Sequence, residues 1–168
     1  MHYSLLLITN TPSWREIKRL MAPFEETYGS RKSKLATEYD DEDDYWYNPN
    51  AHWDWYEVGG RFRGRIPARL GVQTPEDEGL LQYDWYRKYC EPSCYTYAKV
   101  EDINLDEFDP YNWSYVLTPD GVWHERETFL WSDGDYVVTS NDSMFADFVE
   151  NFITPYAGCT AVAIDVHM

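Results

Sequence analysis

The residues best suited to chemistry lie in one stretch, 53–65, where indole rings, two adjacent glycines and three arginines follow one another. If this stretch is extended, Trp53 and Trp55 lie on one face, and such rings can stack on a nucleotide base. Adjacent glycines let backbone N–H groups approach an anion, and guanidinium groups bind phosphate through paired hydrogen bonds. If the chain stays extended past the glycines, the three arginines also line one side. The predicted ligand contacts are Trp53, Trp55, Gly59, Gly60, Arg61, Arg63 and Arg65.

A structural role is the alternative for the same stretch. Positions 61–69 hold four of the fourteen basic residues of an acidic chain. These arginines could neutralise the acidic run 38–44, while the Trp rings lie in the core. The sequence leaves both interpretations open.

A second group combines two histidines with carboxylates. Asp165 and His167 are two positions apart on an expected strand and therefore share a face, while His124 and Glu125 follow an expected hairpin turn. If that hairpin neighbours the last strand, the imidazoles and carboxylates converge. They could then form a general acid–base pair or a site with two histidines and a carboxylate. The catalytic candidates of this alternative are His124, Asp165 and His167; an exposed chain end is the other interpretation.

Other chemistries find little support. The sequence has no G-x-S-x-G, Walker or dinucleotide-binding glycine pattern. Its three cysteines, with a single C-x3-C spacing, give neither a disulfide framework nor a zinc site. Six acids within 38–44 lack the spacing of a calcium loop, and we expect a solvated loop because like charges repel. We therefore predict no cofactor and no metal.

Composition narrows the class of partner. Thirty acidic and fourteen basic residues give a net charge of −16, which argues against direct nucleic-acid binding and against anionic membranes. The aromatic content is high, with eight Trp and fifteen Tyr, and suits binding surfaces as well as a core. No apolar run reaches transmembrane length, and no signal peptide is evident. We expect a cytoplasmic protein.

The element pattern predicts a single α+β domain over residues 1–168. Apolar runs at 3–9 and 159–166 indicate buried strands, and 53–58 and 95–100 indicate two more. Helices are expected after Ser13, after Thr74, and over 142–153. Residues 113–125 indicate a hairpin around Pro119-Asp120-Gly121. We expect a largely antiparallel sheet with the terminal strands central and two or three helices on one face.

Residues 48–62 resemble the signature N-P-x-A-x-W-D-W-W/Y-x-x-G-G-R-W/F of a family of small phage and prophage proteins. The resemblance continues through 98–104, through Thr118-Pro119-Asp120-Gly121-Val122-Trp123-His124-Glu125, and through 161–168. His52 and Phe62 depart from the family, which usually has a basic residue and Trp there. The resemblance implies a phage-type origin and draws attention to both candidate groups, but it implies no particular reaction.

Three functions remain open on these grounds. The first is an accessory protein that binds a nucleotide-like or phosphorylated ligand, with sequestration of a host defence signal as its expected role and a homo-oligomer as one expected state. The second is a phosphoester or nucleotide hydrolase that uses the histidines. The third is an acidic inhibitor or DNA mimic that binds a basic host defence protein through the 38–44 run.

Overall fold

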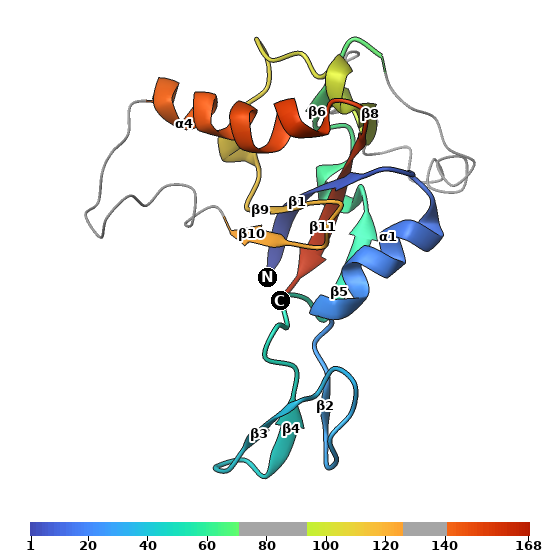
Figure 1. Ribbon diagram of the computed structural model, residues 1–168, viewed down its shortest axis with the longest axis vertical. Coiled ribbons are helices and arrows are strands. Elements are labelled where there is room, and N and C mark those ends of the chain that lie inside the picture. The colour runs from blue at the N-terminus through green and yellow to red at the C-terminus, as the bar shows by residue number, and fades with distance from the viewer. Residues whose placement is uncertain (71–93, 126–140) are drawn as a thin grey trace.

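A computed structural model describes residues 1–70, 94–125 and 141–168 (Figure 1). Cys90 and the helix that was expected after Thr74 both lie outside the described residues. The main sheet is built from β1 (His2–Thr9), β5 (Trp55–Val58), β8 (Tyr97–Lys99), β9 (Tyr115–Leu117), β10 (Trp123–Glu125) and β11 (Thr160–His167). Its order is β10-β9-β1-β11-β5, and β8 also pairs with β11.

The two terminal strands form the centre of this sheet, as predicted. β1 and β11 are antiparallel over eight residue pairs, from His2 opposite His167 to Thr9 opposite Thr160. β9 joins β1 in parallel, and the remaining pairings are antiparallel. The two chain ends therefore lie side by side (Figure 1). The expected α+β class, the mostly antiparallel sheet and the central terminal strands are confirmed.

The apolar side chains of β1 alternate between two cores. Leu6 and Ile8 pack with Phe148 and Phe152, whereas Leu5 and Leu7 pack with Ile17, Leu20 and Met21. Each fully buried Leu or Ile stabilises the fold by about 1.5–3 kcal/mol. Because both faces of β1 are apolar, each face needs a cover. The described helices therefore pack on opposite faces, and the prediction of helices on one face is wrong in this detail.

Helix α1 (Trp14–Met21) covers one face. It starts as its sequence indicates, because the Ser13 side chain accepts a hydrogen bond from the Glu16 N–H at 3.2 Å. A 3-10 turn, η1 (Ala22–Phe24), follows where Pro23 ends the α-helix. Trp14, at the start of the helix, is 39 % exposed.

Helix α4 (Asn141–Phe148) covers the other face and continues as a π-helical turn, η6 (Val149–Ile153), and a 3-10 turn, η7 (Thr154–Tyr156). The predicted helix over 142–153 is thus present, with a change of pitch near its end. The short remaining pieces are η2 (Gly60–Phe62), β6 (Ile66–Pro67), β7 (Cys94–Tyr95), η3 (Val100–Asp102) and η4 (Pro110–Asn112).

A small three-stranded sheet projects from the body below α1 (Figure 1). It consists of β2 (Tyr28–Gly29), β4 (Tyr45–Tyr47) and β3 (Glu38–Asp40), and we call residues 26–47 the arm. The acidic run was predicted to be a loop throughout, but Glu38–Asp40 is a strand. Its backbone pairs with Tyr45–Tyr47. Contacts between aromatic rings on the two strands offset the repulsion among the acidic side chains, and the remaining acids of the run lie in the turn between the strands.

Candidate functional site

β5 ends in a tight turn that the two glycines make possible. Gly59 has a φ of 77° and Gly60 a φ of 46°, a backbone region that L side chains rarely adopt. The Gly59 N–H donates to the Ala163 carbonyl at 2.7 Å, which anchors the turn on β11. The chain then enters η2 and does not stay extended. The adjacent glycines therefore reverse the chain beside the last strand.

Asp165 lies directly under this turn and is 1 % exposed. Its Oδ2 accepts a hydrogen bond from the Arg61 backbone N–H at 3.0 Å, and its Oδ1 lies 2.8 Å from His2 Nδ1. A Cβ at Gly60 would lie 2.5 Å from Asp165 Cβ and 2.6 Å from Oδ2. A buried carboxylate needs such partners. The anion that the glycine turn binds is therefore a carboxylate of the chain itself.

Two further N–H groups of the turn also have partners within the protein. Phe62 N–H donates to the Gly59 carbonyl at 2.8 Å, and Gly64 N–H donates to Thr96 Oγ1 at 3.1 Å. These amides are therefore already used within the protein, and side chains are the main groups left to bind an external anion at this turn.

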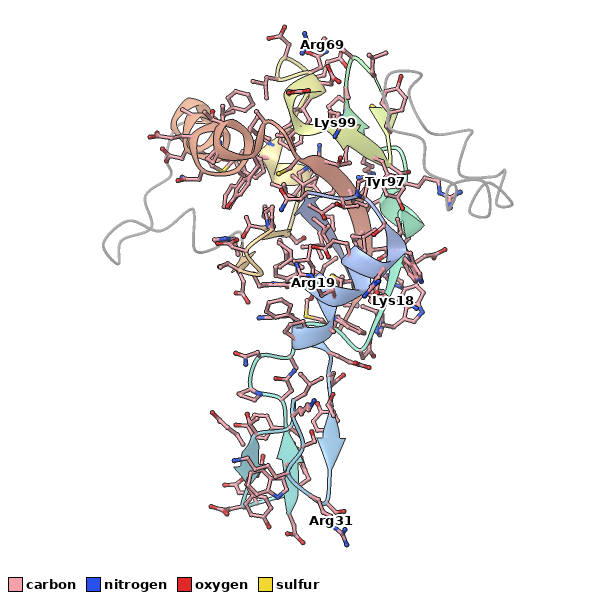
Figure 2. All side chains as sticks on the ribbon, turned by 45° about the vertical axis from the view of Figure 1, so that its right-hand side comes forward. Lys18, Arg19, Arg31, Arg69, Tyr97 and Lys99 are labelled. Atoms are coloured by element: carbon pink, nitrogen blue, oxygen red, sulfur yellow. The ribbon has the colours of Figure 1, made fainter. Side chains whose placement is uncertain are left out.

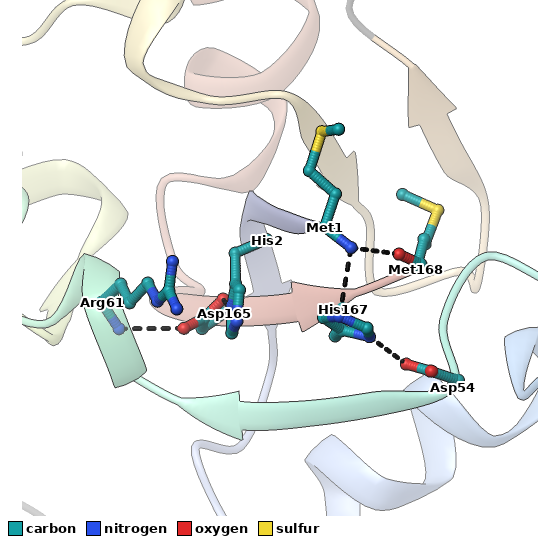
Figure 3. A network of polar contacts seen from close by, with 7 residues as sticks. All are labelled: Met1, His2, Asp54, Arg61, Asp165, His167 and Met168. Atoms are coloured by element: carbon teal, nitrogen blue, oxygen red, sulfur yellow. Dashed lines mark hydrogen bonds and ion pairs between the residues drawn. The ribbon is translucent and has the colours of Figure 1, made fainter.

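His167, two residues after Asp165, lies beside a second carboxylate. Its Nδ1 is 2.8 Å from Asp54 Oδ1, and its Nε2 is 3.1 Å from the Met1 nitrogen, which also donates to the Met168 carbonyl (Figure 3). The hydrogen bond to His167 lowers the pKa of the exposed Asp54 carboxyl below its ordinary value. The end of β11 thus carries two histidine–carboxylate pairs, one buried and one exposed.

Strand register explains why these groups meet. His2, His167 and Trp55 stand opposite one another on β1, β11 and β5, and opposed residues of antiparallel strands point to the same face. The His2 ring packs edge-to-face with both neighbours, with centroid separations of 5.2 Å to His167 and 5.7 Å to Trp55. Trp55 is 46 % exposed. We call His2, Asp54, Trp55, Arg61, Asp165 and His167 the sheet-end cluster.

Arg61 is the arginine that belongs to this cluster. Its residue is exposed, and Figure 3 shows its side chain beside Asp165 and His2. Arg63 packs back against the turn, since a Cβ on Gly59 would lie 3.3 Å from Arg63 Nε. Arg65 lies over the Phe62 ring at 5.5 Å and lines a separate hollow of about 360 Å³. Because the chain turns at Gly59, the three arginines do not line one side.

Trp53 and Trp55 do not share a face either. β5 begins only at Trp55, and Trp53 precedes it in a single bridge with Glu25. The Trp53 side chain is buried in the α1-side core, and its Nε1–H donates to the Met21 carbonyl at 3.0 Å. Trp53 is therefore a core residue, and the stacking surface predicted for both rings rests on Trp55.

His124 lies far from Asp165 and His167. The hairpin of β9 and β10 pairs with β1 and not with β11. His124 on β10 lies opposite Val116 on β9, Val116 lies opposite Leu6 on β1, and Leu6 lies opposite Ala163 on β11. Three strand spacings of about 4.8 Å separate it from β11 by roughly 14 Å. The predicted convergence of His124 with the last strand is wrong, because β1 occupies the position between them.

His124 instead packs edge-on to Phe152 at 5.0 Å, and its Nε2 lies 3.5 Å from Thr118 Oγ1. Burial lowers its pKa. It lines a hollow of about 370 Å³ with Asp120, Asp147 and Asn151. Its neighbour Glu125 lies 3.6 Å from the His52 ring, so His52 also has a partner that the sequence did not indicate.

Sequence reasoning missed two residues of the cluster, Asp54 and, with more consequence for the site, His2. Its relevance depends on β1 lying directly against β11 in the register that opposes His2 to His167. The two apolar terminal runs indicate central strands but not their register. Only the shared-face spacing of Asp165 and His167 gave a signal.

Among residues 1–70, 94–125 and 141–168, no group of three or more His, Cys, Asp or Glu side chains is arranged to hold a metal ion. Within the same ranges, no helix is long and apolar enough to cross a membrane. No protein-family profile, curated protein or solved structure matches the chain.

Proposed function

We propose that the protein binds a small nucleotide-like or phosphorylated ligand at the sheet-end cluster, through Trp55, Arg61 and His2. The observation that carries the proposal is the convergence of these residues around buried Asp165. His2 and the Arg61 backbone each contact that carboxylate at 3.0 Å or less, and the His2 ring touches Trp55. An exposed indole, an exposed guanidinium and an imidazole are thus held together on a rigid base.

Each group has a distinct role in this proposal. Trp55 stacks on the base of the ligand, because an exposed indole face accepts any base. Arg61 binds the phosphate, since its guanidinium presents a rigid set of donors. Asp165 fixes the His2 ring through Nδ1 and leaves Nε2 for the ligand. Arg63 and Arg65, which point elsewhere, supply positive potential but no direct contact.

The biological setting follows from the resemblance to phage and prophage proteins. In a host cell's cytoplasm, a protein that binds a nucleotide-like molecule without consuming it would sequester a host defence signal. Two copies placed with their sheet-end clusters facing each other would enclose such a ligand more completely than one copy does.

Isothermal titration calorimetry with cyclic dinucleotides and ADP-ribose tests the proposal. Arg61→Ala retains the backbone N–H that binds Asp165 and removes only the guanidinium. We expect it to weaken binding roughly tenfold to a hundredfold, as for loss of a charged hydrogen bond. Trp55→Ala should weaken binding roughly tenfold or more. The matched control is Arg15→Ala, which removes an exposed charge from α1 and should change the affinity little. Absence of heat with every ligand, or equal losses in Arg15→Ala and Arg61→Ala, contradicts the proposal.

A hydrolase is the second candidate, and the His2–Asp165 pair favours it. A buried carboxylate that orients an imidazole is the arrangement of a general base. His2 Nε2 would take a proton from water as the water oxygen attacks phosphorus, and the leaving oxygen would depart with a proton from solvent. In this scheme His2 takes the place of His124 and His167, the acid–base pair expected from the sequence.

Chromatography of the ligand after incubation separates the two candidates. A binding protein returns the ligand unchanged, whereas a hydrolase produces the cleaved nucleotide. Under the second candidate, His2→Ala abolishes turnover while Trp55→Ala mainly raises KM.

A further inference from the structure

The arm carries a surface that the sheet-end cluster does not use. Residues 26–47 hold seven acidic and three basic side chains, a net charge of −4, together with five aromatic rings. Figure 2 shows arm side chains standing out from both faces of the small sheet, with Arg31 at its far tip. An exposed aromatic surface of this kind on a protruding sheet is typical of an interaction site.

One face of the arm is built from tyrosines and carboxylates. Tyr28, Tyr45 and Tyr47 are neighbours on it, with ring centroids 5.2 Å and 6.3 Å apart in edge-to-face geometry. Tyr28 donates a hydrogen bond to Glu26, and Tyr47 donates one to Glu38 Oε2 at 3.0 Å. Tyr28 is 59 % exposed. We call these three rings the tyrosine face.

On the opposite face of the arm, an aromatic ring already has a cation placed over it. There, Trp46 packs against Tyr39, and the ammonium group of Lys32 lies 5.4 Å from the Trp46 ring centroid. The chain therefore supplies a cation to the Trp46 side. Within the described ranges, no basic side chain is placed over Tyr28 or Tyr45 in the same way.

A shallow, open hollow on the tyrosine face has the chemistry to take a basic side chain. It measures about 510 Å³ and is lined by Tyr28, Gly29, Ser30 and Tyr45. The aliphatic stem of Lys or Arg would pack on the two rings, and its charged end would meet the ring faces and the Glu26 carboxylate. Phosphate groups of nucleic acids or lipids would be repelled by the same carboxylates.

We propose that the tyrosine face docks a Lys- or Arg-rich segment of another protein, with one basic side chain packed against the hollow that Tyr28 and Tyr45 line. This surface belongs to a different part of the chain from Trp55 and Arg61, so that either binding activity can fail without the other. The acidic residues of the arm attract the partner, and the rings determine where it docks.

The test uses the full chain and a fluorescently labelled synthetic Lys/Arg–Gly repeat peptide, followed by anisotropy. We expect Tyr28→Ser with Tyr45→Ser to weaken binding about tenfold, as for loss of two cation–π contacts. Tyr28→Phe with Tyr45→Phe retains both rings and should bind like the unmodified protein. Thermal unfolding of each variant verifies that the arm substitutions leave the body folded.

Two charge variants separate docking from general attraction. Glu26→Gln, Glu38→Gln and Asp40→Asn together remove three charges from the arm, while Glu101→Gln, Asp106→Asn and Glu150→Gln remove three exposed charges from the body. We expect the arm variant to weaken binding about tenfold and the body variant to change it less than about twofold. Equal losses in the two variants, full binding by the double Ser variant, or no binding by the unmodified protein overturns the proposal.

Discussion

The sheet-end cluster and the arm both combine carboxylates with aromatic rings, but they use the carboxylates differently. In the cluster, Asp165 is buried and bound by a backbone N–H and an imidazole. In the arm, Glu26 and Glu38 accept hydrogen bonds from tyrosine hydroxyls on an exposed surface. A buried carboxylate without partners is costly, whereas an exposed one is already solvated. The first carboxylate therefore organises the fold, and the others remain available to a partner.

The largest effect on the free energy of unfolding should come from replacing Gly60, the glycine that lies against Asp165. Gly60→Ala places a Cβ 2.5 Å from Asp165 Cβ at a φ of 46°, and we expect a loss of about 3–5 kcal/mol in the free energy of unfolding. Gly121→Ala is the matched control, because its φ is 83° but nothing lies within 4 Å. It should cost only about 1–2 kcal/mol. Urea unfolding of both variants gives the values, and equal losses would mean that the Asp165 contact adds nothing.

The second-largest effect on stability should come from removing a carboxylate charge, and it should differ between the sheet-end cluster and the arm. Asp165→Asn retains an acceptor for the Arg61 N–H but loses charged hydrogen bonds in a buried place, and should cost about 1.5–3 kcal/mol. Glu38→Gln in the arm should cost no more than about 0.5 kcal/mol. Denaturant midpoints compare the two substitutions. A larger effect in the arm would reverse the assignment of roles.

These predictions depend on contacts that the sequence indicated only in part. The apolar terminal runs predicted β1 and β11, and Pro119-Asp120-Gly121 predicted the hairpin, because a buried strand and a turn are each specified by residues that are close together in the sequence. The position of Asp165 beside His167 followed from alternation. The identity of the strand that pairs with β11 did not follow from alternation. The sequence could not show that β1 lies between the hairpin and β11, and for this reason it favoured His124 over His2 as a site residue.

Local rules also failed where longer-range packing prevailed. Charge repulsion predicted a loop over 38–44, but pairing with the aromatic strand Tyr45–Tyr47 makes part of it a strand. Alternation predicted a shared face for Trp53 and Trp55, but the strand begins only at Trp55. The glycine pair was expected to offer amides to an external anion, whereas the turn that it forms binds a carboxylate of the chain through the Arg61 N–H. That the anion is Asp165, about a hundred residues further along the chain, could come only from the fold.

A smaller effect should appear in the titration of the arm tyrosines. The hydrogen bond to Glu26, with some burial, raises the pKa of Tyr28 to about 12. The contact therefore contributes to stability fully below the ordinary pKa of 10.0, and this contribution is lost as the pH rises through about 12. Glu26→Gln should return the titration of Tyr28 toward its ordinary value, measured by phenolate absorbance. An unchanged titration in that variant would show that Glu26 is not the cause.

The smallest effect should come from the exposed histidine–carboxylate pair. Because His167 lowers the pKa of Asp54, the pair contributes stability above the ordinary pKa of 3.8, and loses it as the pH falls through the lowered value. Carbon-detected NMR titration follows the Asp54 carboxyl directly. His167→Asn should raise its pKa, while Asp54 in the unmodified protein should titrate below 3.8. A titration at or above 3.8 would contradict the contact.

The most direct test of ligand binding at the sheet-end cluster is NMR mapping of the full chain with ADP-ribose and with a cyclic dinucleotide. We expect the Trp55 indole, the Arg61 side chain and the His2 ring to shift on addition of a ligand that binds. The signals of His124 and of Tyr28 should stay in place. Shifts centred on His124 or on the arm, or no shift with any ligand, would contradict a ligand site built around Asp165.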